Sequence, residues 1–193
     1  MSRGTDLCQS FESCARRLPD GRVQSYWDAL GGVWTIGWGS TGPDIGSQTV
    51  WDQAQCDARF EAQWNKAKAG VLRATRNLAK YPNRLEAVTD FAYNLGIGAY
   101  QTSTLKRYIT QERWSDASKE FGKWDHAGGR VVAGLTRRRA AEASLFALPD
   151  GVVSSPIEAS TGAQTVIVPP DSSSITFPAF LRSVRDLLLR SLG

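Results

Sequence analysis

Apolar residues recur at helical spacing over most of the chain. Leu7 and Phe11 begin the first such stripe, which predicts an N-terminal helix over residues 5–17. The same spacing returns several times after the middle of the sequence. It predicts further helices over residues 71–80, 83–94, 103–110, 112–124 and 135–147.

A longer helix is expected between these segments. Residues 49–52 carry a threonine followed three positions later by an aspartate, which resembles a capping box. The helix that begins there should run to about residue 68, with Phe60 and Trp64 on its buried face.

Alternation of apolar and polar side chains, the pattern typical of strands, marks residues 23–27 and 33–38. Turn-forming residues at 18–22 and 42–46 bound this region. Many helices and few strands predict an α+β fold, with a small sheet lobe and a larger helical lobe. A cleft between two such lobes would suit an extended ligand.

The composition changes at residue 149. Residues 149–176 are rich in Ser, Thr, Pro and Gly, as linkers are, and residues 177–193 carry an apolar helical stripe with arginines mostly outside it. We therefore expect a folded domain over residues 1–148, a linker and an amphipathic helix. That helix either docks on the protein body or on a second copy, which we favour, or lies on a membrane surface. The protein itself is expected to be a monomer.

The residue inventory removes several classes of enzyme. Among 193 residues there is one histidine, His126, so the several His or Cys ligands of a zinc hydrolase are missing and no metal or cofactor is expected. Cys8, Cys14 and Cys56 give no disulfide framework, although a bridge from Cys8 or Cys14 to Cys56 stays open. The net charge of +4 would attract an anionic polymer, and no recognised motif or dense basic patch indicates nucleic acid.

The candidate chemistry lies near the N-terminus. Glu12 is followed by the aromatic, glycine-rich run YWDALGGVWTIGWG at residues 26–39, which contains Asp28 and Thr35. Cleavage of a glycosidic bond needs an acid for the leaving oxygen and an ionised partner near the anomeric carbon. These residues therefore indicate a sugar-cleaving site.

Three ordered blocks of the chain resemble the bacteriophage lysozyme (endolysin) family of muramidases. The first is Glu12 with the run at residues 26–39. The second is LEAVTDFAYNLGIGAY at residues 85–100, and the third combines FGKWDHAGG at residues 121–129 with GLTRRRAAE at residues 134–142. The resemblance covers residues 5–147 and implies a lysozyme-like fold.

The resemblance also implies roles for individual residues. Glu12 would be the general acid, Asp28 the base or electrostatic stabiliser, and Thr35 the residue that holds the water. The bond cleaved would be the β-1,4 linkage between N-acetylmuramic acid and N-acetylglucosamine of peptidoglycan. Residues expected to contact substrate or to support the site are Tyr26, Trp34, Asn94 and Arg137, the last as the ion-pair partner of Glu12.

Several departures from the family pattern keep alternatives open. The gap between Glu12 and Asp28 is longer than usual, so Asp20 is a rival for the second carboxylate, although Tyr26 and the later Trp-Thr pair favour Asp28. The rival activities are a lytic transglycosylase, which needs no water-activating carboxylate, and a virion-associated wall-binding or structural protein on a lysozyme scaffold. Because neither a signal peptide nor a membrane-spanning run is recognised, we expect the protein in the host cytoplasm until its release to the periplasm.

Overall fold

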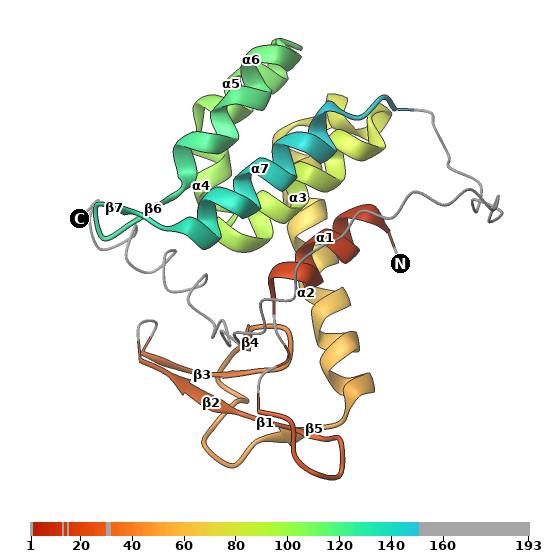
Figure 1. The fold of residues 1–193 in the computed structure, drawn as a ribbon. Helices are drawn as coiled ribbons and strands as arrows, with labels where there is room; N and C mark the ends of the chain where they lie inside the picture. The colour runs from red at the N-terminus through yellow and green to blue at the C-terminus, as the bar shows by residue number, and fades with distance from the viewer. Residues whose placement is uncertain (1, 13, 15, 30–31, 151–193) are drawn as a thin grey trace, which may run out of the picture.

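The computed structural model describes residues 2–12, 14, 16–29 and 32–150. Over these residues the chain forms a lobe of short strands and a larger lobe of helices, as Figure 1 shows. The helices are α1 (Arg3–Phe11), α2 (Gln53–Ala74), α3 (Pro82–Leu95), α4 (Ile97–Thr102), α5 (Thr104–Thr110), α6 (Trp114–Glu120) and α7 (Ala133–Ala147), with 3-10 turns η1 (Arg76–Lys80) and η2 (Phe121–Trp124). The strands are β1 (Val23–Gln24), β2 (Tyr26–Asp28), β3 (Val33–Ile36), β4 (Ser40–Thr41), β5 (Val50–Trp51), β6 (His126–Ala127) and β7 (Arg130–Val131). The predicted two-lobed α+β fold is confirmed.

The strand lobe consists of small antiparallel units. Strands β2, β3 and β4 form one sheet in that order, while β1 pairs with β5 and β6 with β7. The single strand predicted over residues 23–27 is instead divided at Ser25. The Ser25 hydroxyl donates to the carbonyl of Gly46 at 2.6 Å and its backbone N–H donates to the carbonyl of Thr49 at 2.9 Å. The chain thus leaves one ribbon at Ser25 and enters the neighbouring sheet.

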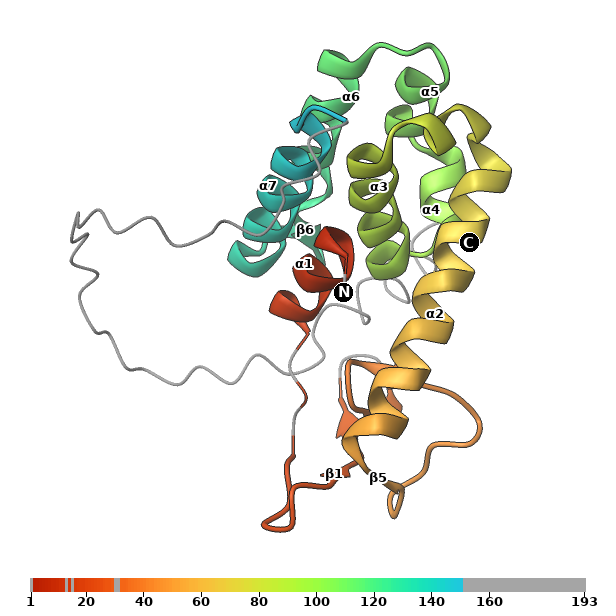
Figure 2. The same cartoon turned by 90° about the vertical axis from the view of Figure 1, so that its right-hand side faces the viewer.

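Helix α2 joins the two lobes, and Figures 1 and 2 show it running from the strands up along the helical lobe. Its start is a capping box, but the box lies three residues later than the predicted pair of Thr49 and Asp52, because Asp52 takes the N-cap position. The Asp52 carboxylate accepts from the Gln55 backbone N–H at 2.7 Å, and the Gln55 side chain accepts from the Asp52 N–H at 2.9 Å. Phe60 and Trp64 are buried as predicted.

The end of α2 differs from the prediction. The helix does not stop near residue 68 but continues to Ala74, so the separate helix predicted over residues 71–80 is wrong. Gly70 lies inside the helix because a neighbouring side chain packs closely on it: a Cβ there would meet Cγ1 of Ile97 at 3.0 Å. A glycine that weakens the helical pattern in the sequence is therefore a packing site in the fold.

Helix α3 forms the centre of the helical lobe. It packs against α7, α2 and α1, so all but a few of its side chains are buried. Phe91 is fully buried and makes edge-on contacts with Phe121 and Trp124, with ring centroids 5.7 and 5.3 Å apart. Because α3 is enclosed on several sides, polar residues that it carries must find partners inside the protein.

Helix α1 is shorter than the predicted span of residues 5–17. A capping box between Ser2 and Thr5 begins it, and Glu12 is its C-cap, with extended backbone at φ −100° and ψ 115°. The backbone N–H of Glu12 still donates to the carbonyl of Cys8 at 3.1 Å. The Glu12 side chain thus leaves from the very end of the helix instead of from its interior.

The folded domain extends beyond the predicted boundary at residue 148. The carbonyl of Pro149 accepts from the Asn83 side chain at 2.9 Å, and the Asp150 carboxylate accepts from the Asn83 backbone N–H at 2.9 Å. Asp150 also forms an ion pair with Arg84, whose guanidinium lies over the ring of Trp114. Residues 149 and 150 therefore contact the helical lobe, while the rest of the predicted linker and the predicted amphipathic helix lie outside the described residues.

No helix within the described residues is long and apolar enough to cross a membrane.

Candidate active site

The β2–β3 hairpin places Asp28 and Thr35 on one face. Tyr26 pairs with Thr35, and Asp28 pairs with Val33. Side chains alternate between the faces of a strand, so Tyr26, Asp28, Val33 and Thr35 share a face, on which Asp28 and Thr35 are diagonal neighbours. Both side chains are buried. The Thr35 hydroxyl has no hydrogen-bond partner within the described part of the chain.

A buried hydroxyl without a hydrogen bond destabilises the fold, unless a water or a ligand supplies the missing partner. Diagonal neighbours on one sheet face typically have backbones about 7–8 Å apart, so their side chains can lean towards a water that lies between them. The geometry of Thr35 is therefore suited to a water held beside Asp28.

The opposite face of the hairpin carries an aromatic pair. Trp27 and Trp34 face each other across the strands with ring centroids 5.5 Å apart, and Trp27 is 52% exposed. Trp34 packs partly against the small core of the strand lobe. This placement corrects the prediction that Trp34 contacts substrate or supports the site, because Trp34 lies on the other face of the hairpin from Asp28 and Thr35. Tyr26 does share their face.

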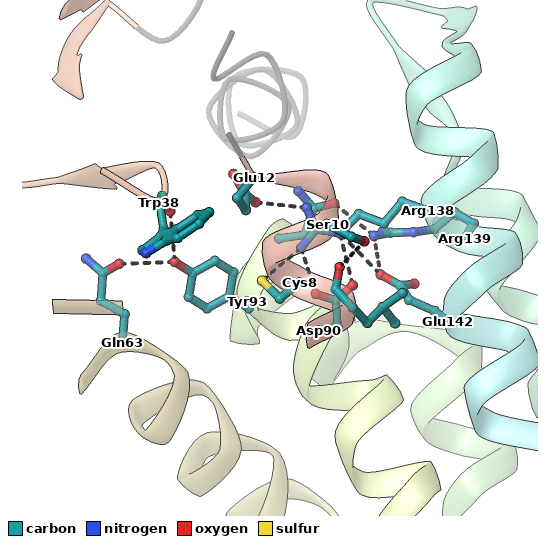
Figure 3. A network of polar contacts seen from close by, with 12 residues as sticks. Cys8, Ser10, Glu12, Trp38, Gln63, Asp90, Tyr93, Arg138, Arg139 and Glu142 are labelled. Carbon is teal, nitrogen blue, oxygen red and sulfur yellow. Dashed lines mark hydrogen bonds and ion pairs between the residues drawn. The ribbon is translucent and has the colours of Figure 1, made fainter. Parts of the chain in front are cut away.

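Glu12 reaches the helical lobe from the C-cap of α1. Its side chain is only 5% exposed, and its Oε1 accepts from Nη1 of Arg138 at 2.8 Å. Figure 3 shows this guanidinium extending from α7 towards Glu12 and Asp90. The sequence-based assignment of Arg137 as the partner of Glu12 is therefore corrected to Arg138. Arg137 is exposed on the same helix, one position earlier.

Arg138 is shared between two carboxylates and is itself fully buried. Its Nε donates to Oδ2 of Asp90 at 2.9 Å and its Nη2 donates to Oδ1 at 2.7 Å, which is a bidentate pair. Burial by itself would raise the pKa of Asp90, but the charge and hydrogen bonds of Arg138 outweigh burial and lower that pKa. In the same way burial opposes the charge on Arg138, but Asp90 keeps the arginine pKa well above its usual value.

A second buried pair lies behind the first. Arg139 donates from Nη2 to the Asn94 carboxamide oxygen at 2.9 Å and also to Glu142. Asn94 is fully buried, which corrects the prediction that it contacts substrate: its carboxamide supports Arg139. Helix α3 ends at Leu95, one residue after the predicted end, and Gly96 follows with a φ of +89°.

Burial and the nearby charge and hydrogen bond of Asp90 raise the pKa of Glu142 well above its ordinary value of 4.5, against the opposing charges of Arg139 and Arg138. A carboxyl group that holds its proton in the fold but loses it in the unfolded chain destabilises the protein progressively as the pH rises above 4.5. Within that window the loss approaches about 1.4 kcal/mol per pH unit.

We therefore expect Glu142→Gln to stabilise the protein, more at pH 8 than at pH 5. Gln keeps an acceptor for Arg139 and a donor for Asp90, as a protonated carboxyl group does. Urea unfolding at both pH values measures the difference from wild type, with Glu61→Gln, an exposed change on α2, as the control. A difference from wild type that stays the same between pH 5 and pH 8 would mean that Glu142 is ionised in the fold.

The rival carboxylate Asp20 has a different role. It is exposed and forms an ion pair with Arg22 at 2.7 Å, and the hydrogen bonds from Arg22 lower its pKa. Its carboxylate thus lies on the surface in a local turn, whereas Asp28 is buried beside Thr35. The structure favours Asp28.

The three cysteines are free thiols. Cys14 packs against Cys56 in the strand lobe, and a hydrogen bond joins their thiols. Burial raises the pKa of Cys56 to about 12, so little of this thiol is ionised near neutral pH. Cys8 lies elsewhere, with its sulfur 3.4 Å from Nη2 of Arg138.

Sequence reasoning missed Asp90, Arg138 and Glu142 as a group. One signal was available: Asp90 stands in an apolar helix that predicts a fully buried environment, where an acid needs a cationic partner. Among the described residues no group of three or more His, Cys, Asp or Glu side chains is placed to bind a metal ion.

Comparison with known proteins agrees with this geometry. The family model described as phage lysozyme matches residues 11–142. A SAR-endolysin of Bacteriophage PS34 is 35% identical over 124 residues, which are 63% of this chain and 71% of the relative. The endolysin of Bacillus phage PZA is 34% identical over 113 residues, or 58% of this chain and 43% of the relative. The chain spans about half the length of the first curated relatives that it matches.

Among solved structures, the muramidase domain of SpmX from Asticaccaulis excentricus aligns with a TM-score of 0.66 and 27% identity, over 77% of this chain and 97% of that domain. The structure places a buried acid at the end of the first helix and a hairpin with Asp28 and Thr35 on one face. The family model covers both features, because it matches residues 11–142. The chain belongs to the phage lysozyme family.

Proposed function

We propose that the protein is an endolysin that hydrolyses the β-1,4 bond between N-acetylmuramic acid and N-acetylglucosamine in peptidoglycan. Glu12 donates a proton to the leaving oxygen, Asp28 acts as the base or stabilises positive charge at the anomeric carbon, and Thr35 positions the attacking water. The observation that carries the proposal is the buried Thr35 hydroxyl, which has no hydrogen-bond partner among the described residues and shares a face with Asp28.

Water placement separates hydrolysis from the rival chemistry. A lytic transglycosylase closes an anhydro sugar within the substrate and has no use for a held water, whereas a hydrolase delivers water to the anomeric carbon. Proteins named endolysin among the relatives support the biological role proposed here, which is lysis of the host from its wall. We propose release from the host cytoplasm to the periplasm as the route, with peptidoglycan as the macromolecular partner.

The test is digestion of purified murein followed by mass spectrometry of the muropeptides. We expect products with reducing sugar ends, and we expect Thr35→Val to slow their formation because it removes the hydroxyl and retains the shape. Anhydro sugars as the main product would indicate a transglycosylase. Binding to murein without release of any muropeptide would indicate a wall-binding protein.

A further inference from the structure

Asp90 lies behind the proposed catalytic acid without touching it. It stands on α3, is fully buried, and takes two of the N–H donors of Arg138. Another donor of the same guanidinium, Nη1, goes to Glu12. One arginine thus connects a carboxylate deep in the helical lobe with the carboxyl group at the end of α1.

Among the described residues, the titratable groups that contact Glu12 or its partner Arg138 come from three helices. Helix α1 contributes Cys8 beside Glu12, and burial raises the pKa of this thiol well above its usual value, so it is uncharged. Helix α3 contributes the Asp90 carboxylate. Helix α7 contributes Arg138, together with Arg139 and Glu142, which bond to each other further from Glu12. Arg138 is the cation in direct contact with Glu12, and Asp90 is the anion that offsets it.

A lone guanidinium at hydrogen-bond distance would oppose the proposed function of Glu12. A cation within about 4–6 Å favours the ionised form of a carboxyl group, typically by 1–3 pH units. A general acid needs the protonated form at the working pH. The bidentate contact with Asp90 reduces the net charge that Arg138 presents, and it also fixes the guanidinium plane so that Nη1 points to Glu12.

We propose that Asp90 is a positioning residue for the reaction, which keeps Glu12 able to carry its proton by neutralising and orienting Arg138. The inference rests on the proposed role of Glu12 as general acid. Asp90 acts through the arginine and does not contact substrate. No other carboxylate within the described residues forms a bidentate hydrogen-bonded pair with Arg138.

The test compares Asp90→Asn with wild type. In the variant Arg138 is uncompensated, so Glu12 loses its proton at lower pH. We expect the alkaline limb of the kcat profile on murein to move by about one pH unit to the acid side. On that limb the rate falls about tenfold relative to wild type, with KM little changed. Titration of the Glu12 side chain by carbon-13 NMR should show the same displacement without reference to activity.

Asp90→Glu is the matched control, because it keeps the negative charge and disturbs the packing. Its alkaline limb should stay where it is in wild type, even if the protein is less stable. A purely structural role for Asp90 would lower the rate of both variants at all pH values and move neither limb. An unmoved limb and an unmoved Glu12 titration in Asp90→Asn overturn the proposal.

A double variant, Asp90→Asn with Arg138→Met, keeps the test informative if Asp90→Asn alone does not fold. With both charges removed, the alkaline limb of the kcat profile should lie within about half a pH unit of the wild-type limb. If the limb of the double variant instead moves by about one pH unit to the acid side, the proposal is contradicted. If the proposed function itself is wrong, Glu12→Gln retains full activity. The NMR titration of Glu12 would still show whether Asp90 and Arg138 affect the proton on Glu12.

Discussion

Glu12→Gln is expected to lower the rate of murein hydrolysis by at least about 100-fold, because general acid catalysis typically contributes 10²–10⁴. Gln keeps the shape of the side chain and an oxygen that can accept from Nη1 of Arg138, but it has no proton to give to the leaving sugar. The loss should appear in kcat and not in KM, since the proton is transferred only as the bond breaks. Turbidity loss of purified murein and release of reducing ends measure the rate.

The matched control for this variant is Glu61→Gln, which makes the same chemical change on the exposed surface of α2. It should leave both the rate and the thermal midpoint close to those of wild type. The circular dichroism spectrum of Glu12→Gln should also match wild type, because the substitution retains a partner for Arg138. A folded Glu12→Gln protein with undiminished activity would show that another group is the acid.

Arg138→Met is expected to reduce the free energy of unfolding by about 3–5 kcal/mol, because it leaves Asp90 buried without a cation. The loss should depend on pH. Arg138 lowers the pKa of Asp90 in the fold, so the pair contributes stability above the ordinary value of 3.8 and loses it as the pH falls. The difference between wild type and variant should therefore be full near pH 7 and smaller below about pH 4.

Arg137→Met is the control, because Arg137 is exposed and lies one position away on the same helix. It should change the free energy of unfolding by no more than about 0.5 kcal/mol. Adding Asp90→Asn to Arg138→Met should recover part of the lost stability, since it removes the buried charge of Asp90 that the loss of Arg138 leaves uncompensated. Urea denaturation at pH 7 and pH 3.5 measures all four proteins, and equal losses for Arg137→Met and Arg138→Met would contradict the assigned ion pair.

The choice among the three consecutive arginines shows where sequence reasoning stops. Successive residues on a helix point about 100° apart, so at most two of Arg137, Arg138 and Arg139 can face the interior. Which two do so depends on how α7 is rotated against α3 and α1. In α7, Leu135 and Glu142 are buried with Arg138 and Arg139, which turns Arg137 outward. The weak amphipathic pattern of this helix did not reveal that rotation.

The same limit applies to Asn94 and Trp34. Both residue types are common in sugar-binding clefts, and neither the amide nor the indole reveals from sequence which direction it faces. The enclosure of α3 turns Asn94 towards Arg139, and the register of β2 with β3 puts Trp34 on the other face of the hairpin from Asp28. A register one residue different would have exchanged the two faces of the hairpin.

By itself the sequence determined the local features of this protein: the helices and strands set by residue spacing, the start of α2 close to residue 52, and the candidates Glu12, Asp28 and Thr35. These depend on contacts between neighbours in the chain. Only the tertiary structure decided that α1 ends at Phe11, that α2 passes through Gly70, and that Asp90 and Arg138 meet behind Glu12. The last contact joins residues that are 48 positions apart on two helices, and no local rule specifies the rotation and distance of two packed helices.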